Sequence, residues 1–402
     1  MASSTSVEFW DVGATASSAL EMTVGEISFH LGIDWLPSLP PPFRSSIFGW
    51  PPLLIDTLAM SATGAELLCL NIQAARSERQ WKSVLSWMLG IAGARHFMKQ
   101  EGYRWIAPMS AFYPDSIQTV DLSNWHPSFP QSVVQASPQP NSSVRLRPDY
   151  LAIRPATTGQ FDWAVVEAKG TAGSLTNRNI CPPEWRDQVR NIVVKVQNQP
   201  LTIPRHLVVA TRVNPNASRP MTRRIQVRAW NNRAPSEEHL LPSAGAVEIV
   251  AAHLFGLFVG LRLPDFARAI RHSVEARRTS AERHLNAYER ELLHRDAAVA
   301  EENLARRPRR PIAPDAQQPD AQIDVETERG TLEVDLSTPL MTLTRRLCRA
   351  ETVEVAAEIV QKADAELSFW EASRRAEIRQ VREIVMPFGV ELRVPAEFEP
   401  RR

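Results

Sequence analysis

Two short, almost unbroken apolar runs constrain the fold of this chain more than any other feature of its sequence. They are Trp163-Ala-Val-Val and His206-Leu-Val-Val-Ala-Thr211. Runs of this length, rich in β-branched residues, are typical of strands that are covered on both faces. Strands of that kind need helices to cover them, so these runs predict a mixed α/β core.

The neighbouring segments complete this core. Apolar positions at helical spacing predict a helix over 58–100, which Gly102 ends. Residues 103–106 and 149–153 are predicted strands, and 185–196 is a predicted helix. The predicted order is therefore helix, strand, strand, strand, helix, strand.

The rest of the chain divides around this core by composition. Prolines break the first segment, charged residues dominate the region after the core, and a Pro- and Arg-rich stretch follows it. The predicted units are an N-terminal Pro-rich extension packing on the core (1–57), the α/β domain (58–235), a helical region with one long charged helix (236–305), a linker (306–330) and a mostly α-helical C-terminal region (331–402). Within the last unit, a short strand at 332–336 is expected to precede a helix over 340–385.

Composition also indicates a compartment. The three cysteines, Cys69, Cys181 and Cys348, are far apart, which excludes a disulfide scaffold and fits a reducing cytoplasm. The N-terminus lacks the pattern of a signal peptide. The longest apolar run, 249–261, contains His253 and is too short to span a bilayer, so it predicts a buried helix and no membrane partner.

One cluster of side chains in the predicted core carries chemistry. Arg147-Pro-Asp149 leads into one strand, and Glu167-Ala-Lys169 ends the next strand 18 residues later. Side chains at i and i+2 of a strand project from the same face, so Glu167 and Lys169 point together while Ala168 points into the core. A strand pair can bring Asp149 into the same small volume.

Two adjacent carboxylates repel, and their pKa values rise unless a cation relieves them. Mg²⁺ does this well, because it prefers oxygen ligands and keeps several waters. Such an ion activates water and neutralises the charge that develops on a phosphoryl group. An ammonium beside it, here that of Lys169, can orient the attacking water or stabilise the transition state. This equipment predicts metal-dependent hydrolysis of a phosphodiester.

Pro148-Asp149 and Glu167-Ala-Lys169, at the end of an apolar strand, resemble the motif of the PD-(D/E)xK nuclease superfamily. The resemblance covers about 60–215, and the predicted element order matches that family's core. It implies a restriction-endonuclease-like fold, in which a mixed central sheet is flanked by helices. It also implies that Asp149 and Glu167 ligate Mg²⁺ or Mn²⁺, with the carbonyl of Ala168 as a further ligand, and that Lys169 is catalytic.

The same resemblance suggests two further positions. Many members place a glutamine or lysine on the helix after the motif, a place that Gln188 fits, with Lys195 as a second candidate. Members often add an acid from the first helix. Glu66 and Glu78 compete for that role, and the sequence does not decide between them.

The charge distribution points to a polyanionic partner. Residues 141–233 hold 15 basic and 5 acidic residues, a net charge of +10, so the rest of the +1 chain carries −9. A solvated basic face normally alternates with acids, but nine basic residues and no acid lie between Gln188 and Ser236. Such clustering beside a metal site indicates a nucleic-acid groove. The candidate nucleic-acid contacts are Arg147, Arg190, Lys195, Arg212, Arg223 and Arg224.

The sequence therefore predicts a Mg²⁺-dependent deoxyribonuclease, with an endonuclease favoured. By analogy alone, its role would be prokaryotic defence, restriction or DNA repair. A homodimer or a subunit of a larger complex would suit double-strand cleavage, because each site cuts one strand. The alternative is a catalytically inactive nucleic-acid-binding or assembly subunit built on a nuclease-like fold, and the intact Asp149, Glu167 and Lys169 favour the enzyme.

Overall fold

The structure is a computed structural model of the 402-residue chain. It describes residues 6–11, 17–21, 26–27, 29–30, 58–60, 68–70, 79–116, 118–125, 148–156, 160–171, 181–212, 226–231, 240–306, 320–327, 330–377 and 383–393.

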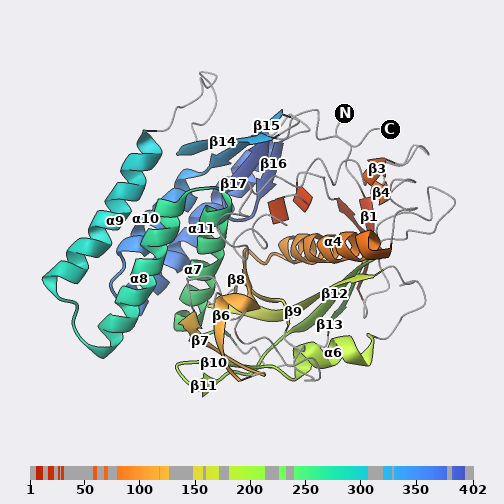
Figure 1. The fold of residues 1–402 in the computed structure, drawn as a ribbon, viewed down its shortest axis with the longest axis horizontal. Helices are drawn as coiled ribbons and strands as arrows, with labels where there is room; N and C mark the ends of the chain where they lie inside the picture. The colour runs from red at the N-terminus through yellow and green to blue at the C-terminus, as the bar shows by residue number, and fades with distance from the viewer. Residues whose placement is uncertain are drawn as a thin grey trace.

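A mixed seven-stranded sheet forms the centre of the α/β core (Figure 1). The strands are β1 (Ser6–Asp11), β2 (Ser17–Glu21), β5 (Trp105–Pro108), β8 (Tyr150–Pro155), β9 (Phe161–Thr171), β12 (His206–Arg212) and β13 (Gln226–Asn231). They follow the order β2-β1-β13-β12-β9-β8-β5. β5, β8 and β9 are antiparallel neighbours, whereas β12 lies parallel to β9. A parallel neighbour requires a crossover, and that crossover contains helix α6 (Pro183–Arg190).

Two helices cover opposite faces of the central strands (Figure 1). Helix α4 (Arg79–Gln100) and α6 both pack on β9 and β12. Gly170 of β9 faces α4, whereas Trp230 of β13 contacts Trp185 of α6, with ring centres 6.0 Å apart. The predicted mixed α/β class is confirmed. The expected order of helix, strand, strand, strand, helix, strand is interrupted by four further strands, which lie between β5 and β8 and between α6 and β12. Trp230 is 2% exposed and belongs to the hydrophobic core.

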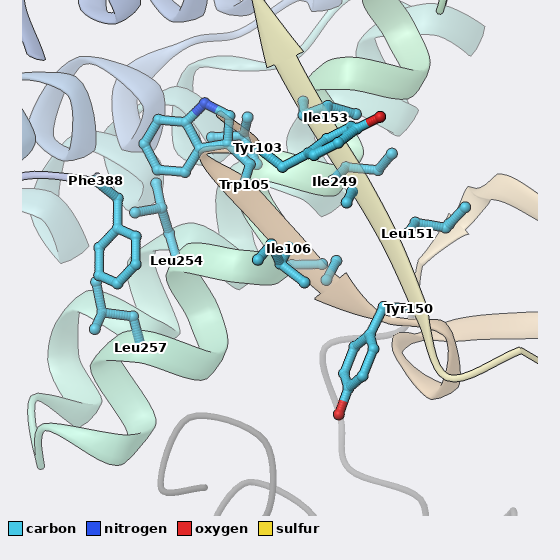
Figure 2. Packing of buried hydrophobic residues seen from close by; sticks show 14 of the residues in the cluster. Tyr103, Trp105, Ile106, Tyr150, Leu151, Ile153, Ile249, Leu254, Leu257 and Phe388 are labelled. Carbon is cyan, nitrogen blue, oxygen red and sulfur yellow. The ribbon is translucent and has the colours of Figure 1, made fainter. Parts of the chain in front are cut away.

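Helix α7 (Ser243–Gly260) is a buried core helix, as its apolar sequence predicts. Figure 2 shows Leu254 of α7 near Trp105, at the start of β5, and Leu257 of the same helix beside Phe388. α7 also contacts β8 and helix α11 (Val353–Glu377). By length and composition α7 could cross a membrane, but 72% of it is buried inside the molecule, as is usual for the core helix of a soluble protein. No other helix among the described residues meets that test.

A second sheet of four strands is built from segments inserted between the core strands. Its order is β11-β10-β7-β6. The strands are β6 (Phe112–Ser116), which follows the 3-10 turn η3 (Met109–Ala111), β7 (Thr119–Trp125), β10 (Val193–Val196) and β11 (Gln199–Pro200). Gln197 and Asn198 both have positive φ, as a type I′ hairpin turn requires. The side chain of Asp121 on β7 holds this turn, because its Oδ2 accepts a 2.7 Å hydrogen bond from the backbone N–H of Asn198.

The remaining elements form a C-terminal half of helices and strands. The helices are α8 (Pro264–Glu282), α9 (Ala287–Ala305), α10 (Thr338–Arg349) and α11. The strands are β14 (Ala321–Thr327), β15 (Gly330–Leu336), β16 (Glu383–Met386) and β17 (Val390–Arg393), in the order β14-β15-β17-β16. A separate two-stranded sheet pairs β3 (Leu58–Met60) with β4 (Leu68–Leu70).

A buried ionic cluster joins the core to this C-terminal half. Arg104, directly before β5, lies 3.2 Å from Asp364 of α11 and is ion-paired with Glu371 of the same helix. Its guanidinium also donates to Ser368 at 2.8 Å and to the carbonyl of Pro387. All of these charged side chains are buried, so the cluster fixes α11 against the edge strand of the main sheet.

Several sequence-based expectations for helices were wrong. The helix expected over 58–100 begins only at Arg79, because β3 and β4 occupy its first part. The helix expected over 185–196 ends at Arg190, and the β-branched run Val193-Val-Lys-Val196 forms β10 instead. Local strand preference and sheet pairing overrode helical spacing in both cases.

The C-terminal expectations need similar correction. The long charged helix is two helices, because Asn286 caps α9 through a reciprocal hydrogen-bond pair with Glu289. The helix expected over 340–385 is α10 and α11 followed by β16, and β14 lies within the expected linker. Most described residues of 331–402 are helical, as predicted, but the region also contributes β15, β16 and β17 to a four-stranded sheet.

Candidate active site

The register of β8 against β9 brings the two predicted carboxylates together. Tyr150 pairs with Val166, so the next position along places Asp149 opposite Glu167. Asp149 Oδ2 accepts a 2.7 Å hydrogen bond from the amide of Ala168. Asp149 therefore caps the end of the strand ladder and fixes its carboxylate beside the motif.

The cluster lies on the face of the sheet that α6 covers. Gly170 faces α4, so Lys169 and Glu167, which alternate with it along β9, face the other way. Ala168 packs against the hydrophobic core, as its position in the strand predicts. The strand pleat thus separates the reactive side chains from the packing side chains.

Lys169 and Glu167 form a direct ion pair through Glu167 Oε1. The two side chains differ in exposure, at 23% for Lys169 and 3% for Glu167. Glu167 Oε2 is buried and receives no hydrogen bond from the described residues. The ammonium therefore satisfies only part of a deeply buried carboxylate.

The electrostatics of Glu167 are those of a crowded carboxyl pair. Burial, and then the neighbouring Asp149 with which it shares a hydrogen bond, raise the pKa of Glu167 to about 8. The ion pair with Lys169 opposes this rise. A second cation at the pair would stabilise both ionised carboxylates.

These residues fit a hard divalent ion by the chemistry of their donors. Mg²⁺ is commonly held by one or two carboxylates while it keeps several waters. Asp149 and Glu167 supply two such carboxylates. Oε2 of Glu167, which accepts no hydrogen bond from the described residues, would be a buried ligand atom. No group of three or more His, Cys, Asp or Glu side chains suited to a metal occurs in the described part of the chain. Any ion here would rely on two carboxylates, backbone and water.

The other predicted site residues have mixed outcomes. Gln188 lies on α6 and is buried, on the helix that packs over the site face of β9. Lys195 lies on β10, opposite Asp121, and is therefore not on the helix after the motif. Glu66, Glu78, Arg147, Arg223 and Arg224 lie outside the described residues.

Basic side chains continue from the carboxyl pair across the same face of the sheet. The register places Lys169, Ala210 and Arg228 side by side on β9, β12 and β13. Arg212 projects from the same face two residues beyond Ala210. Arg190 is exposed at the end of α6. The pKa of His206 is lowered mainly by the burial of its own ring and secondly by the positive charge of Arg190. Sequence spacing alone could not select Arg228, because its place depends on a pairing between distant strands.

Comparisons of this chain with protein-family models, with curated proteins and with solved structures found no match.

Proposed function

We propose that this protein is a metal-dependent deoxyribonuclease of the PD-(D/E)xK type, with a restriction-endonuclease-like core. The observation that carries the proposal is the convergence of Asp149, Glu167 and Lys169 on one face of two paired strands. A buried carboxyl pair with one adjacent ammonium is costly to fold. Binding and cleaving a phosphodiester gives that arrangement a use.

Asp149 and Glu167 would hold Mg²⁺ or Mn²⁺, together with the carbonyl of Ala168. The ion supplies an activated water and charge neutralisation at the phosphoryl group. The Lys169 side chain is partly exposed, so its ammonium would contact the phosphate and stabilise its developing charge. Gln188, on the helix over this face, would orient the substrate or water.

The charge of the site face supports a nucleic-acid substrate. Lys169 and Arg212, both partly exposed, lie on two neighbouring strands, and the buried Arg228 adds positive charge beneath this face. Arg190 adds a further cation on the helix above. Cations arranged beside a carboxyl pair would hold the strand through its phosphates, independently of base sequence. DNA is the partner that we propose for this face.

The wider setting is proposed by analogy. Defence, restriction or repair in a prokaryotic cytoplasm suits such an enzyme, and the buried free thiols of Cys181 and Cys348 are compatible with a reducing compartment. Cutting both strands would require a homodimer or a multi-protein complex, since the chain has one such cluster among its described residues.

A cleavage assay tests the proposal. Full-length protein is incubated with plasmid, linear duplex, single-stranded DNA and RNA in Mg²⁺ and in Mn²⁺, beside Asp149→Ala and Lys169→Ala. We expect metal-dependent DNA cleavage that both substitutions abolish. Cleavage that survives either substitution contradicts the site.

The same assay separates the rival functions. Salt-sensitive DNA binding without cleavage would identify a binding subunit. Absence of both binding and cleavage would identify an assembly subunit that uses a nuclease-like fold.

A further inference from the structure

The backbones of α4 and β9 touch directly behind the candidate site. A Cβ on Gly170 would lie 1.7 Å from the carbonyl oxygen of Ser86. A Cβ on Gly90 would lie 2.6 Å from the amide nitrogen of Gly170 and 2.8 Å from the carbonyl carbon of Lys169. All three atoms belong to the backbone, so no side chain can rotate to make room. Any side chain at either glycine must push the helix and the strand apart.

Backbone conformation does not explain these glycines. Among the described glycines, only Gly102 and Gly389 have positive φ. Alanine at position 90 would also favour the helix over glycine. The missing Cβ is therefore needed for the close approach itself.

Helix α4 spans both strands that carry the cluster. Its contact at Gly170 lies next to Lys169, on the opposite face of β9. Its Arg95 guanidinium lies over the ring of Tyr150, 5.1 Å from the ring centre, and Tyr150 follows Asp149 at the start of β8. One rigid helix thus sets the position of the Glu167–Lys169 motif and of Asp149.

We propose that Gly90 and Gly170 are positioning residues of the active site. By allowing α4 to rest on the backbone of β9, they fix the peptide of residues 168–170 relative to Asp149. The inference rests on the proposed function for its catalytic consequence, but not for its structural one. Displacing this peptide would move the Lys169 ammonium and the Ala168 carbonyl together.

The test compares Gly90→Ala and Gly170→Ala with the matched control Gly93→Ala in the full-length protein. Gly93 lies on the same helix, where a Cβ would meet side-chain atoms of Thr211 and Val227, the nearest at 2.0 Å. Those are side-chain rather than backbone atoms, and neither residue belongs to the cluster. All three variants overpack the α4–sheet contact, so a purely structural role predicts similar behaviour.

Two readouts are measured on each variant, after circular dichroism confirms folding. The first is cleavage of linear duplex DNA in Mg²⁺, where misplacement of about 1 Å can cost about 100-fold in rate. We expect losses of that order in Gly90→Ala and Gly170→Ala, and cleavage near the wild-type rate in Gly93→Ala. The second is labelling of lysines by an amine-reactive reagent, quantified by mass spectrometry with Lys195 as internal reference. Labelling of Lys169 should rise several-fold in the first two variants only.

The two readouts separate failure of this inference from failure of the proposed function. If the wild-type protein cleaves nothing, the nuclease proposal fails, and Lys169 labelling alone decides the positioning role. Equal Lys169 labelling in Gly90→Ala, Gly93→Ala and the wild type overturns it. Equal cleavage in those three proteins also overturns it. Gly90→Ala decides the outcome if Gly170→Ala does not fold.

Discussion

Glu167 is the residue where stability and proposed activity oppose each other. Its carboxyl is 3% exposed, and Lys169 forms an ion pair with one of its oxygens. Burial raises its pKa to about 8, so ionising it costs folding free energy. The sign follows from linkage: an acid with a raised folded-state pKa contributes stability below its unfolded pKa, and that contribution is lost as pH rises through about 8.

Glu167→Gln should therefore stabilise the protein while inactivating it. At pH 8 without divalent ions, the neutral amide avoids the ionisation cost, and unfolding by urea should require at least about 1 kcal/mol more. DNA cleavage should fall by about 100-fold or more, because an ion would lose a charged ligand. A variant less stable than the wild type at pH 8 would show that the buried charge is compensated. Gln160→Glu is the control, because it exchanges the same two residue types at an exposed position outside the cluster. Gln188 cannot serve for this purpose, because it is itself a candidate site residue.

At the scale of elements, Arg104 is the main link between β5 and α11. It serves two buried carboxylates, Asp364 and Glu371, and the hydroxyl of Ser368. Removing one partner of such a cluster leaves uncompensated buried charge.

Arg104→Met should accordingly destabilise the chain by about 3–5 kcal/mol, measured by denaturant unfolding. Ser368→Ala, which deletes one hydrogen bond of the same cluster, should cost only about 1 kcal/mol. Equal effects of the two substitutions would contradict the central place of the guanidinium.

The same cluster should make stability depend on pH. Burial is the main cause that raises the pKa of Asp364 to about 6 and of Glu371 to about 7, against the opposing charge of Arg104. The folded state therefore holds more protons than the unfolded state between about pH 4 and 7, and stability from these groups falls as pH rises through that window. Asp364→Asn should flatten this fall in thermal melts recorded across the window from about pH 4 to 7. An unchanged slope would mean that Asp364 does not titrate there.

The sequence predicts elements well where one periodicity dominates. The apolar run Trp163-Ala-Val-Val predicted the strand, and the i, i+2 spacing of Glu167 and Lys169 predicted that they share a face. Sequence-based prediction failed for 193–196 and 58–70, where short β-branched or apolar segments gain stability only from distant strands. The pairing of Asp149 with Glu167, the place of Arg228 and the contact of Gly90 with Gly170 are likewise non-local. No local pattern encodes them.

At the scale of the whole molecule, the two halves share one hydrophobic core. Phe388, between β16 and β17, stacks on Phe29 with ring centres 5.8 Å apart and contacts His253 of α7 at 4.8 Å. Figure 2 shows Phe388 facing the same apolar region as Trp105 and Leu257. The C-terminal strands therefore complete the core instead of forming a separate domain.

Separate expression of residues 1–306 and 320–402 should consequently give insoluble or unfolded fragments, because each would expose this surface to water. Expressed together, the two fragments should purify as one folded complex. A soluble 1–306 fragment with a cooperative thermal transition would contradict a shared core.

The central claim is that Asp149 and Glu167 bind the metal ion, whereas Lys169 acts on the phosphate and is not needed for metal binding. The most direct measurement follows Mn²⁺ binding by calorimetry and DNA cleavage in the same samples of wild type, Asp149→Asn and Lys169→Met. We expect the wild type to bind Mn²⁺ and cleave DNA, and Asp149→Asn to lose both activities. Lys169→Met should still bind Mn²⁺, but its cleavage rate should fall by about 100-fold or more. Cleavage by Asp149→Asn at the wild-type rate, or Mn²⁺ binding that Asp149→Asn leaves unchanged, would contradict the account.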